Sequence, residues 1–196
     1  MTLKRLFFAY DEKPILFNVS LDLPKTGITC LTGESGCGKT TLLRLLCGLE
    51  TPQAGEIIDP PHRPAVVFQE DRLLPWKTAL ENVALPLGDA SDATARAKKA
   101  LDAVGLSDEE QARLPKALSG GQCRRVAIAR ALALPDADAL LLDEPFAGLD
   151  DERVATVAAL LRDVAKEKPV FVITHDSDDQ KRLNATLLRL RGGIVE

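Results

Sequence analysis

One eight-residue stretch constrains the fold of this chain more than any other part of its sequence. Gly33 to Thr40 reads Gly-Glu-Ser-Gly-Cys-Gly-Lys-Thr and matches the pattern G-x-x-x-x-G-K-[ST]. A buried apolar run over 28–32 precedes it, and a helix is expected over about 39–47. Glycines let backbone N–H groups point inward at an anion, and the helix N-terminus adds its positive end. The stretch is therefore predicted to cradle phosphates, with Lys39 on the β- and γ-phosphates and the Thr40 hydroxyl on Mg²⁺.

The rest of the chain predicts an α/β protein with a mainly parallel sheet. Strands are expected over 3–10, 15–23, 28–32, 65–68, 139–143, 170–174, 185–190 and 193–195, and further helices over 93–104, 122–134 and 152–166. Alternation of strands and helices favours a parallel sheet covered on both faces. The two N-terminal strands, joined by a short Glu-Lys-Pro turn, are expected to form an antiparallel β-subdomain before it. The segment 71–134 is rich in Ala, Leu, Lys and Arg and reads as a helical insert. We expect one domain, 1–196, with a catalytic core formed by 1–70 and 135–196 and a helical subdomain at about 71–134.

Composition excludes several classes of protein. The chain has 196 residues, of which 45% are hydrophobic, and its 25 basic and 29 acidic residues give a formal net charge of −4. Such a chain is neither disordered nor fibrous, and an acidic balance argues against nonspecific nucleic-acid binding. Four cysteines without a CxxC pair and only two histidines argue against a zinc site or a disulfide scaffold. No uncharged apolar run approaches the ~18 residues of a membrane span, and the run over 6–10 is too short for a signal-peptide core, so a membrane role is expected only through a partner.

A second chemical feature lies at the end of an expected strand. The apolar run 139–142 leads directly into Asp143 and Glu144. A protein with a phosphate loop needs an acid for Mg²⁺ at the tip of a neighbouring strand, and Asp143 is placed for that role. A carboxylate beside the metal ligand can accept a hydrogen bond from a water molecule and polarise it, which is the role expected of Glu144.

A third motif lies between the phosphate loop and the acidic strand end. Leu118-Ser-Gly-Gly-Gln122, continued by Arg125 to Ala131, resembles the signature of the nucleotide-binding subunit of an ABC transporter. The resemblance covers essentially the whole chain and implies the P-loop ABC ATPase fold, ATP and Mg²⁺ as ligands, and ATP hydrolysis. The start of a helix with a Ser hydroxyl is itself an anion site, so two copies could close head to tail over shared ATP. The signature residues expected to act on the other copy's ATP are Leu118, Ser119, Gly120, Gly121 and Gln122.

The resemblance also implies roles for residues outside these motifs. Tyr10 resembles the aromatic residue that stacks on adenine, and Gln69 resembles the glutamine that touches Mg²⁺ and the attacking water. His175 resembles the histidine that contacts the γ-phosphate and orders Glu144, and Asp150 ends a loop expected to cross the dimer interface. The candidate catalytic residues are Glu144, His175 and Gln69, the candidate metal ligands are Thr40, Gln69 and Asp143, and the candidate ATP-binding residues are Tyr10, Gly33, Glu34, Ser35, Gly36, Cys37, Gly38, Lys39, Thr40 and Thr41.

Three positions depart from the residues usual in the family. Glu34 stands where Pro is frequent, Gly148 replaces a commoner Ala in the interface loop, and Cys123 follows the signature where a polar residue is usual. None of these departures falls on a catalytic group.

The segment 67–83 narrows the group of transporters to which the chain is expected to belong. It is similar to the nitrate, sulfonate, taurine and thiamine-precursor importer group, and a chain without fused membrane helices or a regulatory C-terminal domain resembles prokaryotic importers. The resemblance implies a homodimer of ATPase subunits, peripheral on the cytoplasmic face of the inner membrane. Its expected partners are integral membrane permease subunits and a solute-binding protein, and no nucleic acid is expected.

Several alternatives stay open at this point. An exporter or lipoprotein-release subunit is the nearest rival, and a soluble ABC-type ATPase acting on DNA or ribosomes would favour heptad arms or two cassettes, which the sequence lacks. A nucleotide kinase or switch GTPase would leave the motif over 118–122 unexplained. The apolar stretch 73–76 beside Gln69 either suits a groove for a short cytoplasmic helix or buries Trp76 inside the helical subdomain.

Overall fold

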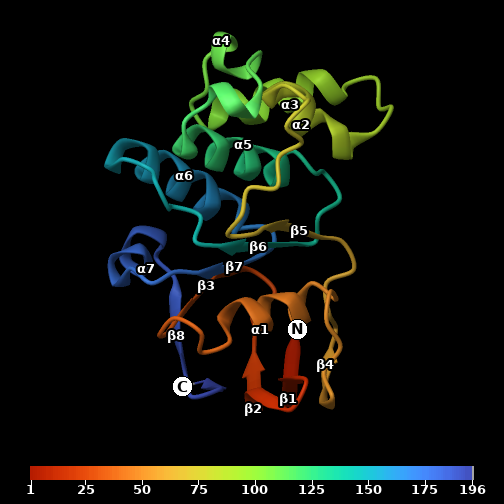
Figure 1. Ribbon diagram of the computed structural model, residues 1–196, viewed down its shortest axis with the longest axis vertical. Coiled ribbons are helices and arrows are strands. Elements are labelled where there is room, and N and C mark those ends of the chain that lie inside the picture. Colours follow the sequence, from red (N-terminus) through yellow and green to blue (C-terminus); the bar gives the residue numbers. More distant parts are fainter. Residues whose placement is uncertain (196) are drawn as a thin grey trace.

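The computed structural model describes residues 1–195, and a six-stranded sheet lies at its centre (Figure 1). The strands run in the order β5, β6, β7, β3, β8, β9. Neighbours from β5 to β8 are parallel, and β8 pairs antiparallel with β9. Their bounds are β3 Gly27–Thr32, β5 Pro64–Val67, β6 Ala139–Asp143, β7 Pro169–Ile173, β8 Thr186–Arg191 and β9 Ile194–Val195. The expected mainly parallel α/β fold is confirmed.

A second, three-stranded sheet is antiparallel and has the order β2-β1-β4. Its strands are β1 Thr2–Tyr10, β2 Lys13–Asp22 and β4 Ala54–Ile58. The first two strands were expected, and β4 was not. This strand reads Ala-Gly-Glu-Ile-Ile and is largely exposed, so it carries neither the alternation nor the β-branched density that marks a strand in sequence.

Seven α-helices are described within residues 1–195, and those of the segment expected to be helical gather on one side of the central sheet (Figure 1). The seven helices are α1 Lys39–Leu46, α2 Ala79–Ala84, α3 Ala93–Ala103, α4 Asp108–Gln111, α5 Gly120–Leu132, α6 Asp151–Val164 and α7 Ser177–Leu183. Two short 3₁₀ turns, η1 Leu85–Leu87 and η2 Pro115–Ala117, lie between them. The gathered helices α2 to α5 fall inside the segment expected to be helical. The limits of the helical subdomain stay a prediction.

Two hydrophobic cores hold these layers together, one on each face of the central sheet. Strand β6 is buried on both faces, with Leu140 and Leu142 in one core and Leu141 in the other. The first core contains residues of α5 and α6 and extends into α2 and α3, whereas the second contains α1 and the inner face of the antiparallel sheet. Burial on both faces explains why β6 is an uninterrupted apolar run in the sequence.

The parallel register brings four strand ends to one edge of the sheet. Leu31 of β3 lies beside Ile173 of β7, and Asp143 of β6 lies beside the same Ile173. Val67 of β5 pairs with Leu142 of β6. The segments that follow β3, β5, β6 and β7 therefore leave the sheet side by side, which is where open parallel sheets place their ligands.

Candidate nucleotide-binding site

The loop after β3 is folded around the amino group of Lys39. Lys39 Nζ donates hydrogen bonds to Gly33 O at 2.8 Å and to Glu34 O at 2.9 Å. Gly38, which caps α1, has a φ of 109°, and a Cβ there would lie 2.9 Å from Ile15 Cγ2. Glycine is therefore required at this position for both its backbone conformation and its lack of a side chain. The loop and the first turn of α1 have the geometry of an anion-binding cradle.

This loop forms one wall of an open cleft of about 610 Å³. The cleft brings together most of the predicted site residues, from segments that are distant in the sequence. The predicted residues that line it are Gly33, Ser35, Gly36, Gly38, Lys39, Thr40, Thr41, Gln69, Asp143, Glu144 and His175, and the lining also includes Ile15, Arg124 and Ala147.

Thr40 and Asp143 meet on the floor of the cleft. Thr40 Oγ1 donates a hydrogen bond to Asp143 Oδ2 at 2.8 Å, although the residues are 103 positions apart. Burial raises the pKa of Asp143, and the hydrogen bond from Thr40 opposes that shift. A hydroxyl and a carboxylate are hard oxygen donors, and Mg²⁺ typically takes one or two such protein groups together with phosphates and waters. The residues present therefore fit Mg²⁺.

Glu144 and His175 form a pair beside this floor. His175 Nδ1 lies 2.8 Å from Glu144 Oε2, and the Glu144 side chain is 17% exposed, against 79% for the imidazole. The hydrogen bond to Glu144 raises the pKa of His175 above its usual value. Glu144 has a φ of 53°, a conformation that non-glycine residues rarely adopt, and its N–H is held by Ile173 O at 2.9 Å. The backbone constraint and the imidazole both fix the position of the Glu144 carboxylate in the lining of the cleft.

Gln69 and Arg124 also line the cleft. Gln69 lies two residues beyond β5, as expected, and Arg124 comes from α5. Sequence reasoning missed Arg124, although Arg124 and Arg125 together precede the apolar stretch Val126–Ala129 of a helix, and basic residues beside such a stretch are a signal of specific partners.

Three predicted ATP-binding residues do not line the cleft. The Tyr10 hydroxyl accepts a hydrogen bond from Arg44 Nη1 at 3.2 Å and lies 3.3 Å from a carboxylate oxygen of Glu50, and its ring packs edge-on against Phe8. Glu34 and Cys37 belong to the phosphate loop, but their side chains are outside the lining. A role for Tyr10 in adenine stacking stays a prediction.

The signature residues also lie away from this cleft. Ser119 caps α5: its Oγ accepts a hydrogen bond from Gln122 N, and Gln122 Oε1 accepts one from Ser119 N at 2.7 Å. A Cβ at Gly121 would lie 2.6 Å from Gly148 O, so this helix start packs directly against the loop that contains Gly148. Asp150 ends that loop as the N-cap of α6, accepting from Arg153 N.

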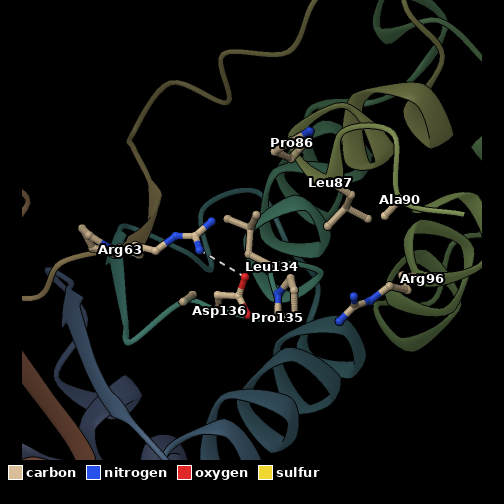
Figure 2. A pocket seen from close by; sticks show the side chains of 10 residues that line it. Arg63, Pro86, Leu87, Ala90, Arg96, Leu134, Pro135 and Asp136 are labelled. Carbon is tan, nitrogen blue, oxygen red and sulfur yellow. Dashed lines mark hydrogen bonds and ion pairs between the residues drawn. The ribbon is translucent and has the colours of Figure 1, made fainter. Parts of the chain in front are cut away.

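A separate cavity, also of about 610 Å³, opens where η1, α3 and the loop after α5 meet (Figure 2). Leu87 and Leu134 form part of its apolar lining. Arg63 lies beside it, paired with Asp136 at 3.1 Å, and Arg96 lies across from them (Figure 2). No predicted site residue is among its lining residues.

The chain matches a known family over two thirds of its length. The family profile described as "ABC transporter" matches residues 16–147. A protein with a phosphate loop, an acidic strand end and a glycine-rich helix cap on this fold is an ABC-type ATPase. The chain belongs to the ABC transporter family, and the expected ATP-binding, ATP-hydrolysing class is thereby confirmed.

Curated relatives cover nearly the whole chain. It is 47% identical over 188 residues to the aliphatic sulfonates import ATP-binding protein SsuB 3 of Paraburkholderia xenovorans (strain LB400), covering 95% of this chain and 74% of the relative. It is 41% identical over 199 residues to SsuB 1 of Paracoccus denitrificans (strain Pd 1222), covering 100% and 81%.

Solved structures confirm the fold. The chain superimposes with a TM-score of 0.88 and 31% identity on the ATP-binding cassette MJ0796, described as dimeric in a post-hydrolysis state bound to ADP and Pi. That match covers 100% of this chain and 96% of the other. A second dimeric structure of MJ0796, described as a bacterial ABC transporter cassette, gives a TM-score of 0.87 at 30% identity.

Proposed function

We propose that this chain is the ATPase subunit of an importer, and that the cleft beside the phosphate loop is its catalytic site. The observation that carries the proposal is the convergence of Lys39, Thr40, Asp143 and Glu144 in one cleft at the carboxyl edge of a parallel sheet. Its relatives are named as import ATP-binding proteins for aliphatic sulfonates, and an organic sulfonate is the proposed solute class.

Each group of residues in the cleft has a separate role in ATP hydrolysis. The loop N–H groups and Lys39 would bind the phosphates, and Thr40, Asp143 and Gln69 would hold Mg²⁺. The metal, when bound, neutralises charge that develops on the phosphate oxygens. Glu144 accepts a proton from the attacking water, and His175 orients the carboxylate through its 2.8 Å contact.

The proposed assembly is a head-to-tail homodimer. The signature residues lie outside their own cleft, and the capped start of α5 is a second anion-binding feature that a second copy can use. The similar cassette MJ0796 is described as a dimer bound to ADP and Pi, which supports the proposal of a dimer.

The proposed membrane partner is a permease with a cytoplasmic helix, and a solute-binding protein completes the importer. Trp76 is 70% exposed, which favours a docking role over packing inside the helical region. Asn82 holds the surrounding turn through hydrogen bonds to Leu74, Lys77 and Thr78. Within residues 1–195, no helix combines the length and apolarity needed to cross a membrane. We place the subunit peripherally on the cytoplasmic face of the inner membrane.

Replacement of Glu144 by Gln tests the chemistry. The substitution keeps the shape of the side chain and removes the base, while Asp143 and Thr40 are unchanged. ATP should bind and persist uncleaved, with turnover about 10²–10⁴-fold lower than in wild type. Turnover is measured on the subunit assembled with its permease, and near-normal hydrolysis would reject the assignment of Glu144.

A further inference from the structure

The segment that carries Gln69 is anchored by arginine side chains of α5. Residues 68–76 connect β5 to the turn before α2 without forming a helix or strand. Arg124 Nη1 donates a hydrogen bond to Phe68 O at 2.7 Å, and Arg124 Nη2 donates to Gln69 O. One guanidinium thus holds two successive main-chain carbonyls, one of them belonging to Gln69 itself.

The same guanidinium is paired with a carboxylate further along the segment. Arg124 Nε lies 3.2 Å from Asp71 Oδ1, and Arg124 is only 5% exposed. Arg130, two turns further along α5, donates to Asp71 O at 2.8 Å and to Arg72 O at 2.9 Å. Burial raises the pKa of Asp71, and the two arginines oppose that shift. A buried charge is tolerated only with such partners, so this contact fixes the segment to α5.

Two successive turns of α5 make different contacts. Its first turn is the Ser119–Gly121 cap, whereas Arg124 lies one turn later and lines the cleft together with Gln69. We propose that Arg124 is a positioning residue that ties the main chain of Gln69 to α5, so that the Gln69 side chain moves in the cleft together with the signature. This inference rests on the proposed function, because it assigns Arg124 a task in the same ATP site.

The chemistry of this position specifically requires arginine. A planar guanidinium can hold two carbonyls and a carboxylate at once in fixed directions, whereas a lysine ammonium is a point charge on a flexible stem. Arg124→Lys should therefore keep the charge but lose the geometry at Gln69. A catalytic group displaced by about 1 Å can lower the rate about 10²-fold, which sets the scale of the expected effect.

The test is a double-mutant cycle between Arg124 and Gln69, measured on the ATPase subunit assembled with its permease. Arg124→Gln should lower kcat for ATP by about 10–100-fold and leave KM within about 2-fold. If Arg124 acts through Gln69, the double variant Arg124→Gln with Gln69→Ala should have a kcat less than about 3-fold below that of Gln69→Ala alone. Arg124→Lys should show most of the loss of Arg124→Gln.

The neighbouring arginine provides a matched control. Arg125 is on the same helix, is similarly buried at 7% exposure, and also donates to two carbonyls, at Val104 and Gly105. Those carbonyls lie at the end of α3 and not in the cleft. Arg125→Gln should lower the unfolding temperature while kcat stays within about 3-fold of wild type. Whatever factor Arg125→Gln takes from kcat should be the same in wild type and in Gln69→Ala, because the two residues act independently.

Normal kcat in Arg124→Gln, or losses that multiply with Gln69→Ala, would overturn the inference. So would wild-type turnover in Gln69→Ala, since Arg124 would then have no catalytic group to position. Should Arg124→Gln fail to fold, the pair Arg124→Gln with Asp71→Asn removes both charges and leaves neither unpaired, and the same kcat is expected of it. Absence of ATP turnover in the wild-type assembly is a separate result, and it would overturn the proposed function itself.

Discussion

At the scale of single residues, the contact between Glu144 and His175 links a titratable group to the proposed base. The carboxylate favours the protonated imidazole, since a negative charge next to a histidine stabilises its positive form. The contribution of this pair to the free energy of unfolding is fully present below the pKa of His175 in the unfolded chain. It is lost as the pH rises through the raised pKa of the folded state.

A titration by NMR checks this residue-scale prediction. The chain has two histidines, so His62 serves as an internal reference. The pKa of His175 should lie above about 6.5 in wild type and fall in Glu144→Gln, because that substitution removes the negative charge. An unchanged His175 pKa in Glu144→Gln would show that the carboxylate does not act on the imidazole.

At the scale of elements, the turn before α2 carries Trp76, which is the most exposed aromatic residue in the part of the chain that the structure describes. Trp76→Ala should leave ATP binding unchanged and weaken the complex with the permease by about 30-fold, which corresponds to ~2 kcal/mol for a central interface residue. Affinity for permease in detergent or nanodiscs gives the measurement. Leu49→Ala, at a 60% exposed apolar residue after α1, is the control and should bind permease normally. Equal affinities for the two variants would place the docking surface elsewhere.

The elements also show what the sequence could and could not predict. The phosphate loop and the run before Asp143 were predicted because their signals are local and consecutive. Helix α2 was missed although Thr78 and Glu81 form a capping box, since six residues are too few to show helical periodicity. Strand β4 pairs with β1, about fifty residues earlier, and Arg124 holds carbonyls 55 and 56 residues away. Such distant partners leave no pattern in a single sequence.

For the whole molecule, the proposed dimer makes a prediction about where each ATP lies. A subunit with Lys39→Ala and a second with Ser119→Arg should each fail as homodimers, since both sites carry a lesion. In the mixed dimer, one site receives both lesions and the other pairs an intact phosphate loop with an intact signature. With Glu144→Gln added to stop cleavage, one radiolabelled ATP should be retained per mixed dimer, because Arg at 119 adds bulk and removes the capping hydroxyl.

The control for the mixed dimer is the Glu144→Gln homodimer, which should retain two ATP molecules. If each subunit used its own signature, every site of the mixed dimer would carry one lesion. A mixed dimer that retains none, while the control retains two, would therefore contradict the head-to-tail arrangement.

Helix α5 has one further consequence in such a dimer. Its first turn would face the nucleotide bound to the partner, while Arg124 binds the Gln69 segment in the cleft of the same subunit. Two such helices would connect the two sites in both directions, so that ATP bound at one site alters the free energy of binding at the other. Thermodynamic linkage makes this influence equal in both directions. The two nucleotides would then bind cooperatively, and the pair of sites, rather than either site alone, would be the unit that responds to ATP concentration.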